Sequence, residues 1–241
     1  MYQEKIELLI NGRWCQGSEG KGQPLVNPAT EAILAEVPHA SESDLEEALL
    51  SSAEGFKIWR DTTAIDRQTI MEKAARLMED RIDEISKTLT MEMGKPLAES
   101  KIEMDFVIAV TRWYAEEGKR AYGRLVPSRV PGARQMVMKE PVGPSCAFVA
   151  WNFPGTNVIR KVAGALGAGC SMLIKPSEET PGTAVAIARC FQDAGLPPGV
   201  LNIVFGIPDE VSRHVLGSWI PRKMSFTGSV PVGKHLQKLA A

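Results

Sequence analysis

The sequence has few cysteines and histidines, and neither kind is spaced as a set of metal ligands. Its 4 cysteines include no C-x-x-C pair, and its 3 histidines are isolated from one another. This pattern argues against a zinc site or a disulfide framework and favours reduced thiols. We therefore expect a cytoplasmic protein without a bound metal.

Long apolar runs and an excess of one charge are also missing. No run approaches the ~20 residues needed to cross a bilayer, and the first residues, Met-Tyr-Gln-Glu-Lys-Ile-Glu, do not resemble a signal peptide. Because 28 basic residues balance 29 acidic ones, nothing favours nucleic acid or an anionic membrane as a partner. The 241 residues, 44% of them hydrophobic, are enough for one or two globular domains.

The second half of the sequence alternates short apolar runs with amphipathic stretches. Strands are expected near 146–151, 171–175, 200–205 and 222–227, and helices near 156–168, 181–194, 208–217 and 231–240. This alternation predicts an α/β fold, a Rossmann-like parallel sheet with helices on both faces. The last helix has no following strand, so the sheet should be incomplete.

The first half favours a small hairpin followed by helices. Residues 6–12 give a strand-and-turn signal ending in Asn-Gly, and Trp14 and residues 25–26 are expected to continue it as edge structure. Three helices should follow: one capped by Ser41 or Ser43, one from about Ala64 to Gly94, and one from about Leu97 to Glu117. We expect them to cover one face of the sheet as a layer.

Residues 123–143 differ in character, since prolines and glycines flank the run Arg134–Lys139. This composition predicts an extended arm or ribbon. An isolated two-stranded ribbon is marginally stable in water, so it would need a partner. From composition alone it could equally be a surface hairpin.

The stretch Cys146–Lys175 reads as strand, tight turn, helix and strand, with Trp151-Asn-Phe-Pro154 at the turn. Proline suits the first position of a helix. Asn152 would therefore lie where the carboxyl end of a strand meets a helix, the edge at which open parallel sheets bind ligands. Its amide could donate to a developing negative charge. By position alone it could also be a helix cap or a turn residue.

Three motifs occur in order: Trp151-Asn-Phe-Pro154, Lys175-Pro-Ser-Glu178 followed by Thr180-Pro181, and Phe226-Thr-Gly-Ser229. Together they resemble the NAD(P)-dependent aldehyde dehydrogenases, most of all the succinate-semialdehyde dehydrogenases, from about Leu9 to the last residue. The resemblance implies the amino-terminal half of such an enzyme. The general-base Glu, in a Glu-Leu-Gly-Gly motif, and the nucleophilic Cys would both lie beyond residue 241.

The resemblance also implies a division of the chain. Residues 1–122 would form a helical layer and the amino-terminal part of the cofactor-binding domain. Residues 123–143 would be an oligomerisation ribbon, and residues 144–241 the βαβ cofactor-binding core. A homo-oligomer, a dimer or a tetramer, is the partner to expect, together with a small aldehyde substrate.

Four residues near the turn take catalytic or substrate roles by this resemblance. Asn152 would hold the oxygen of the thiohemiacetal, and Lys161 would assist proton movement during thioester hydrolysis. Phe153 would contact the substrate, and Arg160 would pair with the far carboxylate of an acidic semialdehyde such as succinate semialdehyde. Without the resemblance, Arg160 and Lys161 read as a solvated basic pair.

The cofactor-binding residues implied by the resemblance are Ala150, Trp151, Lys175, Ser177, Glu178, Gly206, Phe226, Thr227, Gly228, Ser229 and Val232. Lys175 and Glu178 would contact the adenosine ribose, and the acidic Glu178 favours NAD, with NADP possible. Ser229 and neighbouring amides would meet the pyrophosphate at a helix start. Without the resemblance, Lys175 and Glu178 could be ordinary charges beside a helix.

Two further patterns are interpreted without a chemical role. Residues 228–234 look like a phosphate loop, but His235 replaces the Ser or Thr that holds Mg²⁺, and Pro231 removes one cradle N–H. None of the cysteines matches the nucleophile, and Cys146, Cys170 and Cys190 are expected to be buried. The alternatives to an enzyme are a non-catalytic NAD-binding module and an inactive fragment that folds only within an oligomer.

Overall fold

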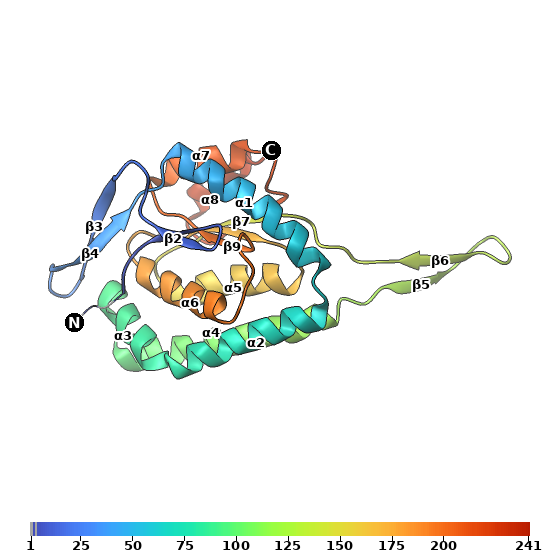
Figure 1. Cartoon of the computed structure of the whole chain (residues 1–241), viewed down its shortest axis with the longest axis horizontal. Coiled ribbons are helices and arrows are strands. Elements are labelled where there is room, and N and C mark those ends of the chain that lie inside the picture. The colour runs from blue at the N-terminus through green and yellow to red at the C-terminus, as the bar shows by residue number, and fades with distance from the viewer. Residues whose placement is uncertain (1, 3) are drawn as a thin grey trace.

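The computed structural model describes Tyr2 and residues 4–241, and at its centre lies a six-stranded sheet (Figure 1). Across the sheet the strands are β10 (Lys223–Phe226), β7 (Ser145–Phe148), β8 (Met172–Lys175), β9 (Leu201–Ile203), β1 (Leu8–Ile10) and β2 (Arg13–Cys15). Strands β10, β7, β8 and β9 are parallel, as the alternating pattern predicted. Every residue of β7, β8 and β9 is buried, as in parallel sheets covered on both faces.

The amino-terminal hairpin extends this sheet. Asn11 and Gly12 both have positive φ, as the tight Asn-Gly turn requires. Leu9 pairs antiparallel with Ile203 of β9, so the hairpin continues the central sheet, a pairing between distant segments that the local pattern did not reveal. The expectation for residues 25–26 was wrong, because they belong to a separate pair of strands, β3 (Gly22–Val26) and β4 (Ile33–Pro38).

The helices are α1 (Glu42–Asp61), α2 (Ala64–Asp80), α3 (Ile82–Met93), α4 (Leu97–Lys119), α5 (Pro154–Gly167), α6 (Pro181–Asp193), α7 (Pro208–Gly217) and α8 (Val230–Leu239). Ser41 caps α1: its hydroxyl accepts the N–H of Asp44, whose carboxylate accepts the N–H of Ser41. The four helices of the second half begin and end within two residues of the predicted bounds. Their starts are marked by proline, which suits the first turn of a helix.

The single helix expected from Ala64 to Gly94 is wrong, because the chain breaks at Arg81 into α2 and α3. No proline or glycine marks the break. The side chain of Arg81 instead forms an ion pair with Asp193 of α6 at 2.7 Å. This contact with a distant helix accompanies the break, and it leaves no signal in the local sequence.

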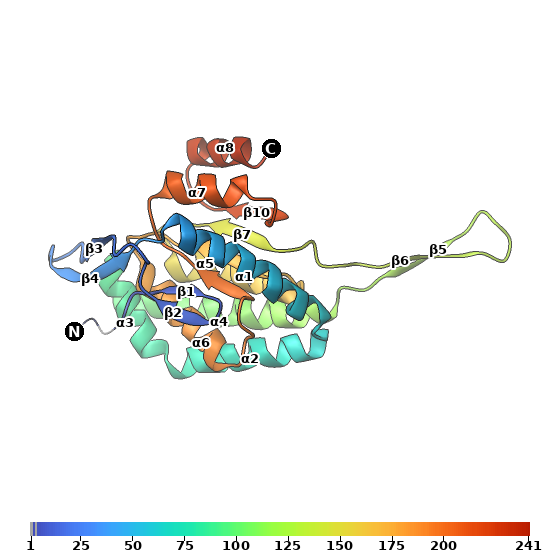
Figure 2. The same cartoon turned by 45° about the horizontal axis from the view of Figure 1, so that its top comes forward.

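The helices form layers on both sides of the sheet (Figures 1 and 2). Helices α1 and α7 lie on one face, and α5 and α6 cover the other. Helices α2, α3 and α4 pack on α5 and α6 and form an outer layer beyond them. The expectation that the first three predicted helices would cover one face of the sheet as a layer was therefore wrong, because α1 lies on the opposite side of the sheet from α2, α3 and α4. The close approach of α4 to α5 depends on Gly167, where a Cβ atom would lie 2.6 Å from the carbonyl oxygen of Tyr114.

The ribbon predicted within residues 123–143 is present. Strands β5 (Arg124–Pro127) and β6 (Arg134–Val137) pair antiparallel and extend far from the body of the molecule (Figures 1 and 2). All their residues are exposed, including the apolar side chains of Leu125 (76% exposed) and Met136 (68% exposed).

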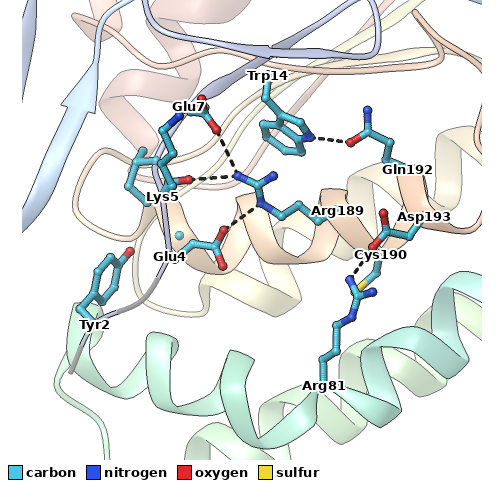
Figure 3. Close-up of polar contacts among 12 residues, drawn as sticks. Tyr2, Glu4, Lys5, Glu7, Trp14, Arg81, Arg189, Cys190, Gln192 and Asp193 are labelled. Atoms are coloured by element: carbon cyan, nitrogen blue, oxygen red, sulfur yellow. Dashed lines mark hydrogen bonds and ion pairs between the residues drawn. The ribbon is translucent and has the colours of Figure 1, made fainter.

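An arginine of α6 fastens the amino-terminal segment to the body (Figure 3). Arg189 donates hydrogen bonds to Glu4 at 3.0 Å and to Glu7 at 3.3 Å, and its guanidinium lies over the ring of Trp14 at 4.2 Å. The first strand is thus tied to the helix that follows β8. Within the part of the chain described here, no helix is long and apolar enough to cross a membrane.

Candidate functional site

The carboxyl ends of β7, β8 and β10 meet at one edge of the sheet and bring the three motifs together. The N–H of Val149 donates to the carbonyl of Lys175 at 3.3 Å, and the N–H of Thr227 donates to the carbonyl of Phe148 at 3.0 Å. The segments after these strands therefore start side by side. This is the edge at which open α/β sheets bind ligands.

A cavity of about 400 Å³, here called the edge cavity, lies at these strand ends and reaches α7 and α8. Every predicted cofactor residue except Gly206 lines it, namely Ala150, Trp151, Lys175, Ser177, Glu178, Phe226, Thr227, Gly228, Ser229 and Val232. Sequence reasoning missed Asp209 and His235, which also line it and contact each other at 3.1 Å. They come from α7 and α8 outside the recognised motifs.

Lys175 and Glu178 form a buried pair in the edge cavity. The ammonium of Lys175 donates to both carboxylate oxygens of Glu178 at 2.6 Å. Glu178 also accepts the backbone N–H of Gly206 at 3.0 Å. Gly206 has a φ of +148°, which disfavours other residues, so the glycine lets its N–H meet Glu178. These hydrogen bonds hold the ammonium of Lys175 and the carboxylate of Glu178 in fixed positions at the wall of the edge cavity.

The start of α8 offers hydrogen-bond donors to the same cavity. Ser229 is the N-cap residue, in extended conformation, and its side chain makes no capping bond to α8. Its hydroxyl and the first N–H groups of the helix are thus free of a side-chain cap, at the end of the helix dipole that favours anions. With the Lys175–Glu178 pair, these groups are the donors and acceptors that a dinucleotide's phosphates and ribose hydroxyls require, so the residues fit NAD or NADP.

A second cavity of about 540 Å³, the α4–α5 cavity, lies on the other side of the turn. Its lining comprises Lys95, Glu99, Ile102, Glu103, Phe106, Phe153, Thr156, Asn157 and Arg160. Phe153 and Arg160 were predicted as substrate contacts, whereas Lys95, Glu103 and Phe106 were not. These last three come from the α3–α4 region, far from the motifs in sequence, and helical periodicity marks such residues only as packing.

Arg160 is the cation available to a ligand in the α4–α5 cavity. Its guanidinium lies over the ring of Phe106 at 5.2 Å and is exposed at the surface. In the described part of the chain it forms no ion pair with a carboxylate. Lys95, by contrast, is buried, pairs with Glu103 at 2.5 Å and lies over the ring of Phe153 at 4.2 Å. An incoming anion would therefore meet Arg160.

Asn152 is exposed in the turn between the two cavities, and its carbonyl oxygen accepts a hydrogen bond from the amide of Asn157 at 3.2 Å. Lys161 lies one residue beyond Arg160 and is partly buried. Burial lowers the pKa of Lys161, and the nearby Arg160 and Lys223 lower it further. A lysine with a lowered pKa exchanges protons more readily near neutral pH.

The cysteines predicted to be buried, Cys146, Cys170 and Cys190, are buried. Burial raises the pKa of Cys146 to about 12 and that of Cys190 to about 11. Cys170 is buried as well, and Cys15 is partly exposed. Cys146 and Cys190 therefore have a raised pKa, whereas a catalytic thiol has a lowered one.

Comparison with known proteins identifies the family. The family model "Aldehyde dehydrogenase family" matches residues 14–241. The 4-(hydroxymethyl)benzenesulfonate dehydrogenase TsaD1 of Comamonas testosteroni is 43% identical over 98% of this chain and 49% of that protein. The chain thus spans about half the length of the curated relatives it matches.

Solved structures share the fold of this chain. The crystal structure of succinate-semialdehyde dehydrogenase from Burkholderia pseudomallei matches with a TM-score of 0.96 at 36% identity, covering 98% of this chain and 49% of that one. A betaine aldehyde dehydrogenase point mutant from Staphylococcus aureus, solved in complex with NAD⁺, matches with a TM-score of 0.95 at 28% identity, over 99% of this chain and 49% of that one.

Proposed function

The chain belongs to the aldehyde dehydrogenase family, and we propose that it supplies the cofactor site and part of the aldehyde site of an enzyme that oxidises an acidic aldehyde with NAD(P)⁺. The observation that supports this most is the pair of cavities on either side of the 149–157 turn. One carries the groups a dinucleotide needs, and the other carries an unpaired arginine. Asn152 lies in the turn between them.

NAD is the preferred cofactor in this proposal, and it would supply the hydride acceptor. Ser229 and the start of α8 would bind the pyrophosphate, and the Lys175–Glu178 pair would contact the adenosine ribose. The buried carboxylate of Glu178 would repel a 2′-phosphate, which disfavours NADP. The solved relative named with NAD⁺ supports the assignment of a nicotinamide dinucleotide.

The substrate in this proposal is an aldehyde with a carboxylate or sulfonate at its far end, such as succinate semialdehyde. Arg160 would hold that anion through two hydrogen bonds, and Phe153 would contact the carbon chain. The names of two relatives, succinate-semialdehyde dehydrogenase and 4-(hydroxymethyl)benzenesulfonate dehydrogenase, both denote compounds with such an anion.

In the reaction, a cysteine thiolate from a region beyond residue 241 would add to the aldehyde carbon. The amide N–H of Asn152 would donate to the carbonyl oxygen as it becomes negative. After the hydride leaves, water would release the carboxylic acid from the thioester, and Lys161 would take part in the proton transfers. The residues of this chain thus orient the aldehyde and stabilise charge, and they do not form the covalent bond.

Two features of the whole protein belong to the same proposal. The exposed apolar side chains of the ribbon, Leu125 and Met136 among them, would pack on another copy in a dimer or tetramer. Buried, unpaired cysteines are compatible with the reducing cytoplasm.

Substitution of Arg160 in the complete enzyme tests the proposal. Arg160→Met should lower kcat/KM for succinate semialdehyde about 10- to 100-fold, the loss of a charge-assisted pair. The kcat/KM for butanal, a neutral aldehyde with the same number of carbons, should change by less than about threefold. Arg160→Lys keeps the charge but not the planar donor pair, so its kcat/KM for succinate semialdehyde should lie between those of the wild type and Arg160→Met. Equal losses for both aldehydes would contradict an anion-binding role.

A further inference from the structure

The structure assigns to Asn157 the role of positioning the amide of Asn152 so that its N–H groups face the aldehyde oxygen. Asn157 lies in the first turn of α5 and lines the α4–α5 cavity. The inference rests on the proposed function, because it deepens the role given there to Asn152. It adds a positioning residue that no motif identified.

The orientation of the Asn157 amide follows from the backbone. Its Nδ2 group donates to the carbonyl oxygen of Ala150 at 3.1 Å. A backbone carbonyl can only accept, so the nitrogen of Asn157, and not its oxygen, must face Ala150. The side chain is 8% exposed, and the backbone N–H of Asn157 is held by the carbonyl of Phe153 at 2.8 Å. Asn157 is therefore fixed in both position and orientation.

The same nitrogen sets the orientation of Asn152. Nδ2 of Asn157 also donates to Oδ1 of Asn152 at 3.2 Å. Since a donor faces that position, Asn152 must present its oxygen there and direct its own Nδ2 elsewhere. No acceptor for the Asn152 Nδ2 occurs within the described chain, and Asn152 is exposed. Its two N–H groups are thus left for an external acceptor.

This matters because the terminal torsion of asparagine has two broad, nearly equivalent minima. An unrestrained Asn152 could present either its oxygen or its nitrogen to the substrate. An oxygen in that place would repel the negative charge that develops on the aldehyde, whereas the nitrogen stabilises it. The hydrogen bond from Asn157 selects the productive minimum before substrate binds, so no rotation is required during the reaction.

Two substitutions of Asn157 in the complete enzyme separate orientation from simple packing. Asn157→Leu removes the donor and leaves the Asn152 amide free to rotate, so kcat should fall several-fold. Asn157→Asp replaces the donor by an acceptor. It should attract the nitrogen of Asn152 and turn its oxygen toward the substrate, so kcat should fall by about 10²-fold, as on removal of an oxyanion donor. The KM for aldehyde and the affinity for NAD⁺ should change little in either variant.

The double variant Asn152→Ala/Asn157→Asp shows whether Asn157 acts through Asn152. Once the amide is removed, Asn157→Asp should cause no further loss of kcat. The matched control is Asn202→Asp. Asn202 is a buried asparagine of β9 with hydrogen bonds of its own. This substitution should lower the melting temperature without changing kcat for the folded enzyme.

The possible failures are distinct. If Asn152→Ala alone leaves turnover intact, the proposed role of Asn152 is wrong and the inference fails with it. If Asn152→Ala lowers turnover but Asn157→Asp does not, the proposed function stands and only the role of Asn157 is overturned. Additive losses in the double variant would likewise overturn it, because Asn157 would then act independently of Asn152.

Discussion

Glu92 is a buried carboxylate whose ionisation should make the stability of this protein depend on pH. It lies at the end of α3 and is 3% exposed. Its oxygens accept hydrogen bonds from the hydroxyl of Tyr2 at 2.7 Å, the N–H of Gly182 at 2.6 Å, and both the N–H and the hydroxyl of Thr183. Glu92 thus caps α6, whose own N-cap residue Thr180 makes no side-chain bond.

Burial raises the pKa of Glu92 from 4.5 to about 7, although these hydrogen bonds partly oppose the change. The difference of 2.5, multiplied by 1.36 kcal/mol per pKa unit, amounts to about 3 kcal/mol. The folded state holds the proton more tightly than the unfolded state. The contribution of Glu92 is therefore fully favourable below about pH 4.5 and is lost as the pH rises through about 7.

Glu92→Gln keeps the size of the side chain and cannot titrate. We expect the free energy of unfolding of the wild type, relative to this variant, to decrease by about 2 to 3 kcal/mol between pH 5 and pH 8. Urea unfolding at several pH values measures this difference and cancels the other titrating groups. Glu84→Gln, which removes an exposed carboxylate from the same helix, is the control. A wild-type-minus-variant difference that stays constant from pH 5 to 8 would refute the assignment.

Three further predictions concern cofactor choice, assembly and thiol chemistry. Glu178→Ser should free Lys175 to pair with a 2′-phosphate and raise the affinity for NADP⁺ relative to NAD⁺ about tenfold, measured by titration of the complete enzyme; an unchanged ratio would contradict the role of Glu178. Leu125→Asp on the ribbon should shift sedimentation toward smaller species without changing the circular dichroism of the fold, and an unaltered sedimentation profile would argue against ribbon-mediated assembly. Alkylation at pH 8 should modify Cys146 only after unfolding, as followed by peptide mass; rapid labelling of the folded protein would contradict its burial.

The second half of the fold was predictable because its signals are local. Strands β7 and β8 are short, mostly apolar runs, and each helix has a proline at its first or second position, so a few neighbouring residues suffice to mark an element. The break at Arg81 is accompanied by a contact with a distant helix, and the pairing of β1 with β9 is itself a contact between distant segments. The outer position of α2 to α4 has the same cause, because amphipathicity shows that a helix has a buried face but not what covers it.

The site also contains residues that local motifs predicted and residues that they did not. Residues such as Lys175 and Ser229 lie within motifs at strand ends, and the parallel topology brings those ends together, so their convergence could be anticipated. Asp209, which reaches the edge cavity from α7, carries no motif. Asn157 was missed for another reason: its role depends on the orientation of an amide, and orientation is set by a hydrogen bond that residue type and spacing do not reveal.

The cysteines decide how much of the chemistry this chain can perform. A thiol with a pKa near 12, as for Cys146, is ionised to only about one part in 10⁵ at pH 7, and burial also bars an aldehyde from reaching it. Cys190 is also buried, and burial raises its pKa to about 11. Burial raises the pKa of Cys15 as well, and the nearby Asp44 and Glu47 raise it further. The described residues therefore include an oriented amide, an arginine without an ion pair and a cavity fitted to a dinucleotide, whereas Cys146 and Cys190 are buried and have a raised pKa. In the proposed reaction, the thiolate that attacks the aldehyde would therefore come from outside these residues and would lie against the turn that holds Asn152.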